Sequence, residues 1–215
     1  MLLCSAARGQ APAYSAAGVV NAANYAPGPF APNSVVTIFG SDLCSNTVCD
    51  KSGATASEVA GGTLPTFQGL AGVSVYVSNI AAPVLFVSPG QINFLIPTNL
   101  LPGTAQVVVV KQGVNGGPVN IALVPGAPAL FPAGGYAIAE DWNAANALVT
   151  ADAPAHSGDV VILYATGLGA AGSNPTGLVP TAAVQIDNLA SLKVYLDGVA
   201  LDTAHILYAG TSHAL

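Results

Sequence analysis

An internal repeat constrains the fold of this chain most. The segment PNSVVTIFGSDL, residues 32–43, is echoed by HSGDVVILYATGL, residues 156–168. A second segment, GVSVYVSNIAAPVLFVSPG (72–90), is echoed by SLKVYLDGVALDTAHILYAG (191–210). Matching residues keep a constant spacing within the first echo: Val35 and Val160, Val36 and Val161, Phe39 and Tyr164, Leu43 and Leu168. Because internal repeats decide architecture, the simplest account is two copies of one unit.

Each copy has the pattern of short β-strands. Val73, Val75 and Val77 alternate with more polar residues, the period of two that buries one face of a sheet. The 24 glycines and 16 prolines close each run with a turn and leave no room for long helices. We therefore expect an all-β fold of two tandem immunoglobulin-like β-sandwich units, the second incomplete. Further predicted strands cover residues 35–39, 84–87, 92–96, 107–110, 121–124, 159–165 and 194–196.

The repeat also predicts the division of the chain. Residues 17–124 form one sandwich, 125–128 (PGAP) a linker and 129–215 a truncated second sandwich, after a remnant of a signal peptide or a disordered N-terminus over 1–16. The second copy stops before counterparts of the last three strands of the first. We expect either a fragment of a longer chain or a unit that takes strands from elsewhere. Such an open edge favours self-association or insertion of another chain's strand, for instance from residues 17–25 of a neighbour.

Charge and hydropathy exclude several classes of partner. Charged residues make up 7% of the chain and the net charge is -6, so no basic surface exists to bind a nucleic-acid backbone. The most apolar stretch, residues 120–139, is interrupted by Pro125, Pro128 and Pro132, and we expect no membrane-spanning segment.

Cysteine usage points to an oxidising compartment. Cys44 and Cys49 bracket a short polar loop and are predicted to form a disulfide; free thiols are the alternative, and two ligands alone do not make a metal site. The first residues resemble the end of a secretory signal, and Cys4 resembles a lipoprotein acylation site. The predicted location is secreted or cell-surface, in the periplasm or outside the cell.

Motifs that suggest chemistry each have a plainer explanation. Residues 167–172 spell G-x-G-x-x-G, with Asp187 beyond, but no helix-forming sequence follows and we predict a turn and no dinucleotide cofactor. His156, Ser157 and Asp159 are too close in sequence to form a relay if they lie along a strand. Asp197 and Asp202 are too few ligands for calcium. We therefore predict no catalytic residues, no cofactor and no metal.

One acidic and aromatic cluster is the best candidate for ligand binding. A lone tryptophan beside amides and carboxylates suits a sugar ring, although such a side chain also packs on its own domain. The cluster comprises Glu140, Asp141, Trp142, Asn143 and Asn146.

Long stretches of both halves resemble one known family. GVVNAANYAPGPFAPNSVVTIFGSDL, LPTFQGLAGVSVYVSNIAAPVLFVSPGQINFLIP, SGDVVILYATGLG and VYLDGVALDTAHILYAG are similar to the Solibacter-type uncharacterised C-terminal domain of secreted acidobacterial proteins. The resemblance spans about residues 18–210, and VSPGQINFLIP is its most specific part. It implies an immunoglobulin-like, IPT/TIG-type sandwich and brings no catalytic residues. Family members carry a second Q-x-N phrase after the final YAG, which favours a truncated chain here.

These observations predict a non-enzymatic extracellular or cell-surface module for adhesion, spacing or protein interaction. The partners would be other extracellular proteins or a polysaccharide. A carbohydrate-binding module centred on Trp142 and a self-assembling filament subunit are the alternatives.

Overall fold

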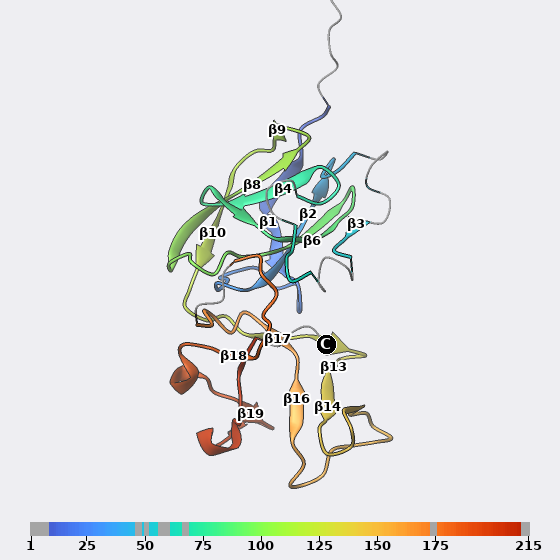
Figure 1. Cartoon of the computed structure of the whole chain (residues 1–215), viewed down its shortest axis with the longest axis vertical. Coiled ribbons are helices and arrows are strands. Elements are labelled where there is room, and N and C mark those ends of the chain that lie inside the picture. Colours follow the sequence, from blue (N-terminus) through green and yellow to red (C-terminus); the bar gives the residue numbers. More distant parts are fainter. Residues whose placement is uncertain are drawn as a thin grey trace, which may run out of the picture.

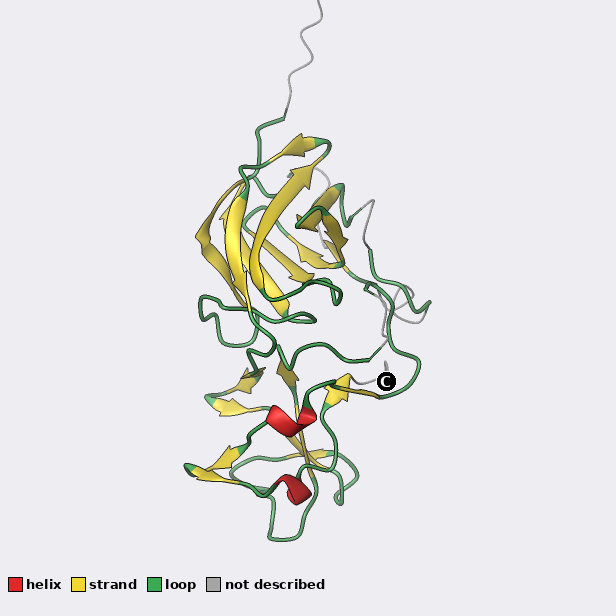
Figure 2. Cartoon of the chain, turned by 90° about the vertical axis from the view of Figure 1, so that its left-hand side faces the viewer, coloured by secondary structure: helices red, strands yellow, loops and turns green. Residues whose placement is uncertain are grey.

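The computed structural model describes residues 9–45, 49, 52–55, 61–65, 69–172 and 176–211. Antiparallel strands dominate this part of the chain, and its helical segments are two single 3₁₀ turns, η1 (Leu189–Ser191) and η2 (Thr203–His205) (Figure 2). The all-β prediction is thus confirmed. The predictions for the signal remnant over residues 1–8 and for acylation of Cys4 lie outside the described residues.

The first half of the chain forms two antiparallel sheets, seen in the upper part of Figure 1. One sheet has the order β1 (Ala13–Asn21), β2 (Val35–Ser41), β7 (Gln91–Leu95), β6 (Val84–Val87) and β3 (Ser52–Gly53). The other has the order β10 (Val119–Leu123), β8 (Gly103–Lys111), β4 (Val73–Val77) and β5 (Ile80–Ala82), with β9 (Val114–Asn115) paired to β8.

A single hydrophobic core lies between these sheets. Ile38 and Phe94 of the first sheet and Val75 of the second are fully buried and belong to one cluster. Burying a side chain of this size contributes about 1.5–3 kcal/mol. The predicted alternation therefore holds in this half, which is a β-sandwich with a continuous interior.

The second half consists of small, separate antiparallel sheets. Its buried cluster contains Ala171, Ile186 and Ala209, with a few partly buried neighbours. The predicted strand over residues 159–165 is divided into two short strands around Tyr164. The sheets are β11 (Ala129–Leu130) with β17 (Ala165–Thr166); β12 (Pro132–Ala133) with β13 (Tyr136–Ala137); β14 (Ala139–Asp141) between β15 (Ala147–Leu148) and β16 (Val161–Leu163); β18 (Val184–Gln185) with β21 (Gly210–Thr211); and β19 (Tyr195–Leu196) with β20 (Val199–Ala200).

Backbone and side-chain hydrogen bonds join the two halves at several places. Thr63 pairs with Leu178 in an antiparallel bridge, and the Thr98 backbone N–H donates to Thr176 Oγ1 at 2.9 Å. The segment between the halves is also attached, because Ala127 N–H donates to the Gly167 carbonyl at 2.8 Å. The second half is therefore held to the first by more than its covalent connection.

Candidate functional site

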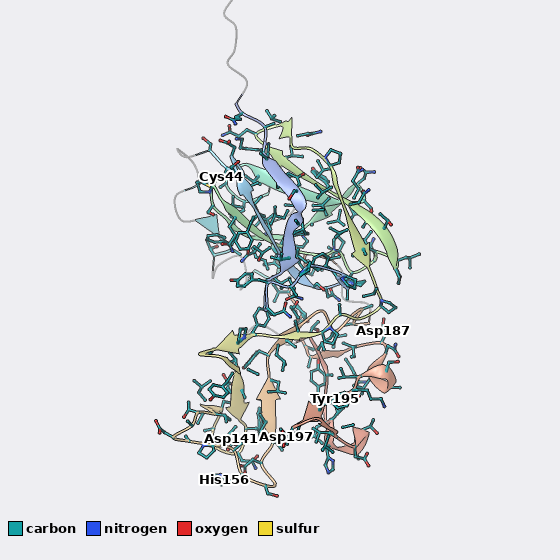
Figure 3. All side chains as sticks on the ribbon, turned by 180° about the vertical axis from the view of Figure 1, so that it is seen from behind. Cys44, Asp141, His156, Asp187, Tyr195 and Asp197 are labelled. Carbon is teal, nitrogen blue, oxygen red and sulfur yellow. A yellow bond between two sulfur atoms is a disulfide. The ribbon has the colours of Figure 1, made fainter. Side chains whose placement is uncertain are left out.

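Cys44 and Cys49 form the predicted disulfide. Their Cα atoms are 5.9 Å apart, and both side chains are buried in the core cluster of the first half. Cys44 follows the end of β2, where Leu43 N–H donates to the Pro89 carbonyl at 3.1 Å. Figure 3 places Cys44 in the upper half, far from the labelled polar residues of the lower half. The bond therefore fastens a loop to the first sandwich and takes no part in the candidate binding cluster.

The candidate cluster occupies the turn after β14. The Asp141 carboxylate accepts the Asn143 backbone N–H at 2.9 Å, and Asn143 Oδ1 accepts the Val160 backbone N–H at 2.8 Å. Asn146 has a left-handed φ of 61° in the same turn. These polar side chains thus shape the turn through their own backbone contacts. Trp142 between them is 60% exposed, so its ring is available to a ligand and does not fill the core.

Glu140 points to a different neighbour, Tyr164. The Tyr164 hydroxyl donates to Glu140 Oε2 at 3.0 Å across the β14–β16 pair. This hydrogen bond to the carboxylate, helped by partial desolvation, raises the pKa of Tyr164 above its usual value. The structure therefore separates the five predicted residues: Glu140 braces the sheet, and the other four lie in or beside the following turn.

An open cavity of about 360 Å³ lies beside this turn. Its polar lining comprises Asp141, Asn143, His156 and Asp159. Asp159 Oδ2 accepts the His156 backbone N–H and lies 3.6 Å from His156 Nδ1. These two side chains are close because residues 156–159 form a turn before β16 begins at Val161, whereas the sequence pattern predicted a strand from residue 159. Sequence reasoning did not assign His156 or Asp159 to this cavity.

The ionisable groups of the cavity have local hydrogen-bond partners or face solvent. Each of its aspartates already accepts backbone N–H groups, and His156 is largely exposed to solvent. Among the described residues no three His, Cys, Asp or Glu side chains converge as metal ligands. The cavity has a mixed polar and apolar lining, and Trp142, which follows Asp141 in the chain, is exposed but is not among the lining residues. An exposed indole can stack on a ligand ring.

The glycine-rich segment 167–171 has no regular secondary structure, and Gly172 lies in a turn. Gly167, Gly169 and Gly172 all have positive φ, and a side chain at Gly167 would collide with the Ala127 carbonyl. Asp187, which follows at the spacing of a cofactor-binding acid, instead accepts the Gly172 backbone N–H at 2.7 Å. Gly167 and Gly169 therefore allow close packing of backbone on backbone, against Ala127 and Pro125, whereas Gly172 faces the side chain of Val184.

Asp197 and Asp202 also have local roles. Asp197 has a left-handed φ of 51° in the two-residue turn between β19 and β20, and Asp202 Oδ1 accepts the Ala204 N–H at 2.9 Å. Both are used in turn and cap geometry, in line with the sequence prediction.

Exposed apolar side chains gather in the second half of the chain. Of the sixteen large hydrophobic residues exposed in the described segments, twelve lie beyond residue 129. Leu196 and Val199 are 70% and 69% exposed on the β19–β20 hairpin. The sequence does not indicate that these residues are exposed, because the repeat predicts that they are buried like their counterparts in the first half. We refer to these exposed side chains together as the apolar surface of the second half, and no sequence pattern indicated their exposure.

The helices in the described part of the chain are all too short to cross a bilayer. No family model matches the chain, and no curated protein matches it either.

Proposed function

We propose that this protein is a non-enzymatic extracytoplasmic module for adhesion, spacing or protein interaction, built of immunoglobulin-like units. The observation that carries the proposal is the concentration of exposed apolar and aromatic side chains in the second half, next to a first half whose core is closed. Exposed apolar side chains mark interaction surfaces where they lie together, as Tyr195, Leu196 and Val199 do on the β19–β20 hairpin. The buried Cys44–Cys49 disulfide supports a location where thiols are oxidised.

A photo-crosslinking amino acid placed on the apolar surface tests this proposal. We expect crosslinks to another macromolecule of the cell surface from Tyr195 or Leu196, and none from Leu101, an even more exposed residue of the first half. Turnover of ester, peptide or glycoside substrates by the purified chain, lost in His156→Ala or Asp159→Ala, would contradict a non-enzymatic role.

A second candidate is polysaccharide binding at the turn after β14. The exposure of Trp142, between two residues that line the cavity, Asp141 and Asn143, favours it. Retention on an immobilised polysaccharide is expected to disappear in Trp142→Ala and to persist in Tyr136→Ala, a control at an exposed aromatic residue in the β12–β13 hairpin. A wild-type chain that no polysaccharide retains would end this candidate.

A further inference from the structure

The β1–β2 hairpin and the β14–β16 pair have the same backbone geometry. Ala22 N–H donates to the Val35 carbonyl at 3.1 Å, and Trp142 N–H donates to the Val160 carbonyl at 2.9 Å. The two pairs of strands also share their register. In the first half the paired residues are Val19–Ile38, Val20–Thr37 and Asn21–Val36. The corresponding pairs in the second half are Ala139–Leu163, Glu140–Ile162 and Asp141–Val161.

The turns that lead into β2 and β16 match as well. Ser34 Oγ accepts the Ala31 N–H at 3.0 Å, and Asp159 Oδ2 accepts the His156 N–H at 2.6 Å. In both turns the reverse bond, from the fourth residue's N–H to the first residue's carbonyl, measures 3.1 Å. β16 therefore stands in the second half where β2 stands in the first.

A second hairpin repeats the comparison. Tyr76 pairs with Ala81 across β4 and β5, and Tyr195 pairs with Ala200 across β19 and β20. Both hairpins turn through two residues of positive φ: Ser78 and Asn79 in one, Asp197 and Gly198 in the other.

The two halves differ in what covers these strands. In the first half β2 has β1 on one edge and β7 on the other, with Val36 opposite Phe94 and Ile38 opposite Ile92. In the second half β16 ends its sheet, with β14 on one edge and no strand on the other among the residues that the structure describes.

The exposed fractions of corresponding side chains differ accordingly between the two halves. Val36 and Ile38 are completely buried, whereas their counterparts Val161 and Leu163 are 41% and 43% exposed. On the second hairpin, Val77 is completely buried and its counterpart Leu196 is 70% exposed. In the first half the equivalent edge of β2 is occupied by β7, an antiparallel strand with large apolar side chains at alternate positions, and Val36 and Ile38 also share a core cluster with the opposite sheet.

We propose that the free edge of β16 is an acceptor site for one extended segment of a partner polypeptide. The segment runs antiparallel to β16 and places one large apolar side chain opposite Val161 and another opposite Leu163, with a polar residue between them. Backbone pairing supplies affinity and the two alternate side chains supply specificity. This assignment rests on the interaction role proposed above and names the chemistry of the partner.

Charge adds a further requirement. Residues 129–211 contain seven carboxylate side chains and one lysine, Lys193. Asp141 is directly paired with Val161, and Asp159 precedes β16. Lysine or arginine residues flanking the apolar pair of the partner segment are therefore favoured, at a strength that falls with added salt.

A synthetic peptide with the sequence of β7 tests the site on the full chain. The peptide carries residues 88–97, SPGQINFLIP, with two lysines at each end, and its binding is followed by fluorescence anisotropy and amide hydrogen exchange. We expect saturable binding that slows exchange at Val161 and Leu163. A control peptide with aspartate in place of the Ile92 and Phe94 equivalents is expected to bind at least tenfold more weakly, as is a version flanked by glutamates.

Matched variants of the protein locate the bound peptide. Leu163→Asp is expected to weaken binding at least tenfold, and Leu207→Asp, at a residue 71% exposed elsewhere in the second half, is expected to leave it unchanged. Absence of binding, equal binding of the control peptide, or binding without protection of residues 161–163 overturns the site. If residues 161–163 are already protected from hydrogen exchange without peptide because the protein self-associates, the partner-peptide site is overturned and a second copy of this chain occupies the edge. If Leu196 crosslinks to a partner but the peptide does not bind, the proposed interaction role stands and only the acceptor site on β16 is rejected.

Discussion

The Val35 backbone N–H donates to Thr166 Oγ1 at 2.7 Å, across a sequence distance that spans both halves of the chain. Thr166 is 4% exposed, and Asn33 Nδ2 nearby donates to the Gly169 carbonyl at 3.3 Å. The turn before β2 is thus completed by residues of the second half. The two halves therefore share hydrogen bonds at this turn.

Thr166→Val should expose the importance of this contact. The substitution keeps the shape of the side chain but removes the acceptor of the Val35 N–H, so we expect a loss of about 1–3 kcal/mol in unfolding free energy. Chemical denaturation measures it. Thr104→Val, at an exposed position of β8, should change stability by less than about 0.5 kcal/mol. Equal effects of the two substitutions would contradict the role given to Thr166.

Alanine substitutions at two glycines with nearly equal φ distinguish the cost of steric crowding from the cost of a left-handed backbone. Gly167 has a φ of 77° and faces the Ala127 carbonyl, whereas Gly198 has a φ of 76° with open space around it. Alanine at Gly198 should cost about 1 kcal/mol, the usual penalty of a left-handed residue. Alanine at Gly167 should cost clearly more, because backbone must move as well. Thermal unfolding of both variants gives the comparison, and a smaller effect at Gly167 would refute the close approach.

Counterpart residues of the two halves should differ in their contribution to stability. Ile38→Ala removes a completely buried side chain and is expected to cost about 2–5 kcal/mol. Leu163→Ala, at the counterpart position that is 43% exposed, should cost less than about 1 kcal/mol. Urea denaturation of the full chain tests both. Comparable losses would mean that Leu163 is covered in solution.

Thiol labelling under denaturing conditions should distinguish the three cysteines. Cys44 and Cys49 are disulfide-bonded, so without a reductant only Cys4 is expected to react, and all three react after reduction. Mass spectrometry counts the labels. Replacing both bonded cysteines with alanine should lower stability by about 2 kcal/mol, the loop-closure estimate for a short ring. Three labels without reduction would refute the bond.

Alkaline pH should weaken the first half through Tyr14. Burial raises the pKa of this hydroxyl, although the bond that it accepts from Val109 N–H opposes the rise. A raised folded-state pKa stabilises the fold fully below the unfolded value of about 10, and this stability is lost as pH rises through the folded value.

Tyr14→Phe should therefore lose less stability than the wild type between pH 9 and pH 11, values chosen to bracket the ordinary tyrosine pKa of about 10. Denaturation midpoints at both pH values measure the change, with Tyr136→Phe, at an exposed tyrosine, as the control. An unchanged pH dependence in Tyr14→Phe would contradict this assignment.

The sequence predicted the fold best where strands alternate strictly. Val73, Val75 and Val77 are buried as expected. Alternation of apolar residues predicts which face of a strand is buried, and the prediction holds here because strands are present on both sides of β4. β1 was not among the predicted strands, since AYSAAGVVN is rich in small residues and has no apolar alternation. That finding also bears on the expected donor segment 17–25, because residues 17–21 lie in β1 and are largely paired with β2 of the same chain.

The candidate site was predictable only in part. The disulfide follows from two nearby cysteines, and the polar turn around Trp142 from its composition. The Tyr164 contact with Glu140 and the approach of Thr166 to Val35 join residues distant in sequence, so no local pattern carries them. The exposure of Leu163 and Leu196 depends on which strands lie against them in the folded chain, and composition does not carry that information.

The attachment of segment 125–128 has a consequence for proteolysis. Pro125, Gly126 and Pro128 are exposed, and the segment joins two halves that are also held by the Thr63–Leu178 bridge and by the bonds to Thr166 and Thr176. A protease that nicks the chain there would leave two fragments that still migrate together under native conditions and separate only in denaturant. The connecting peptide would then be a dispensable part of the joint.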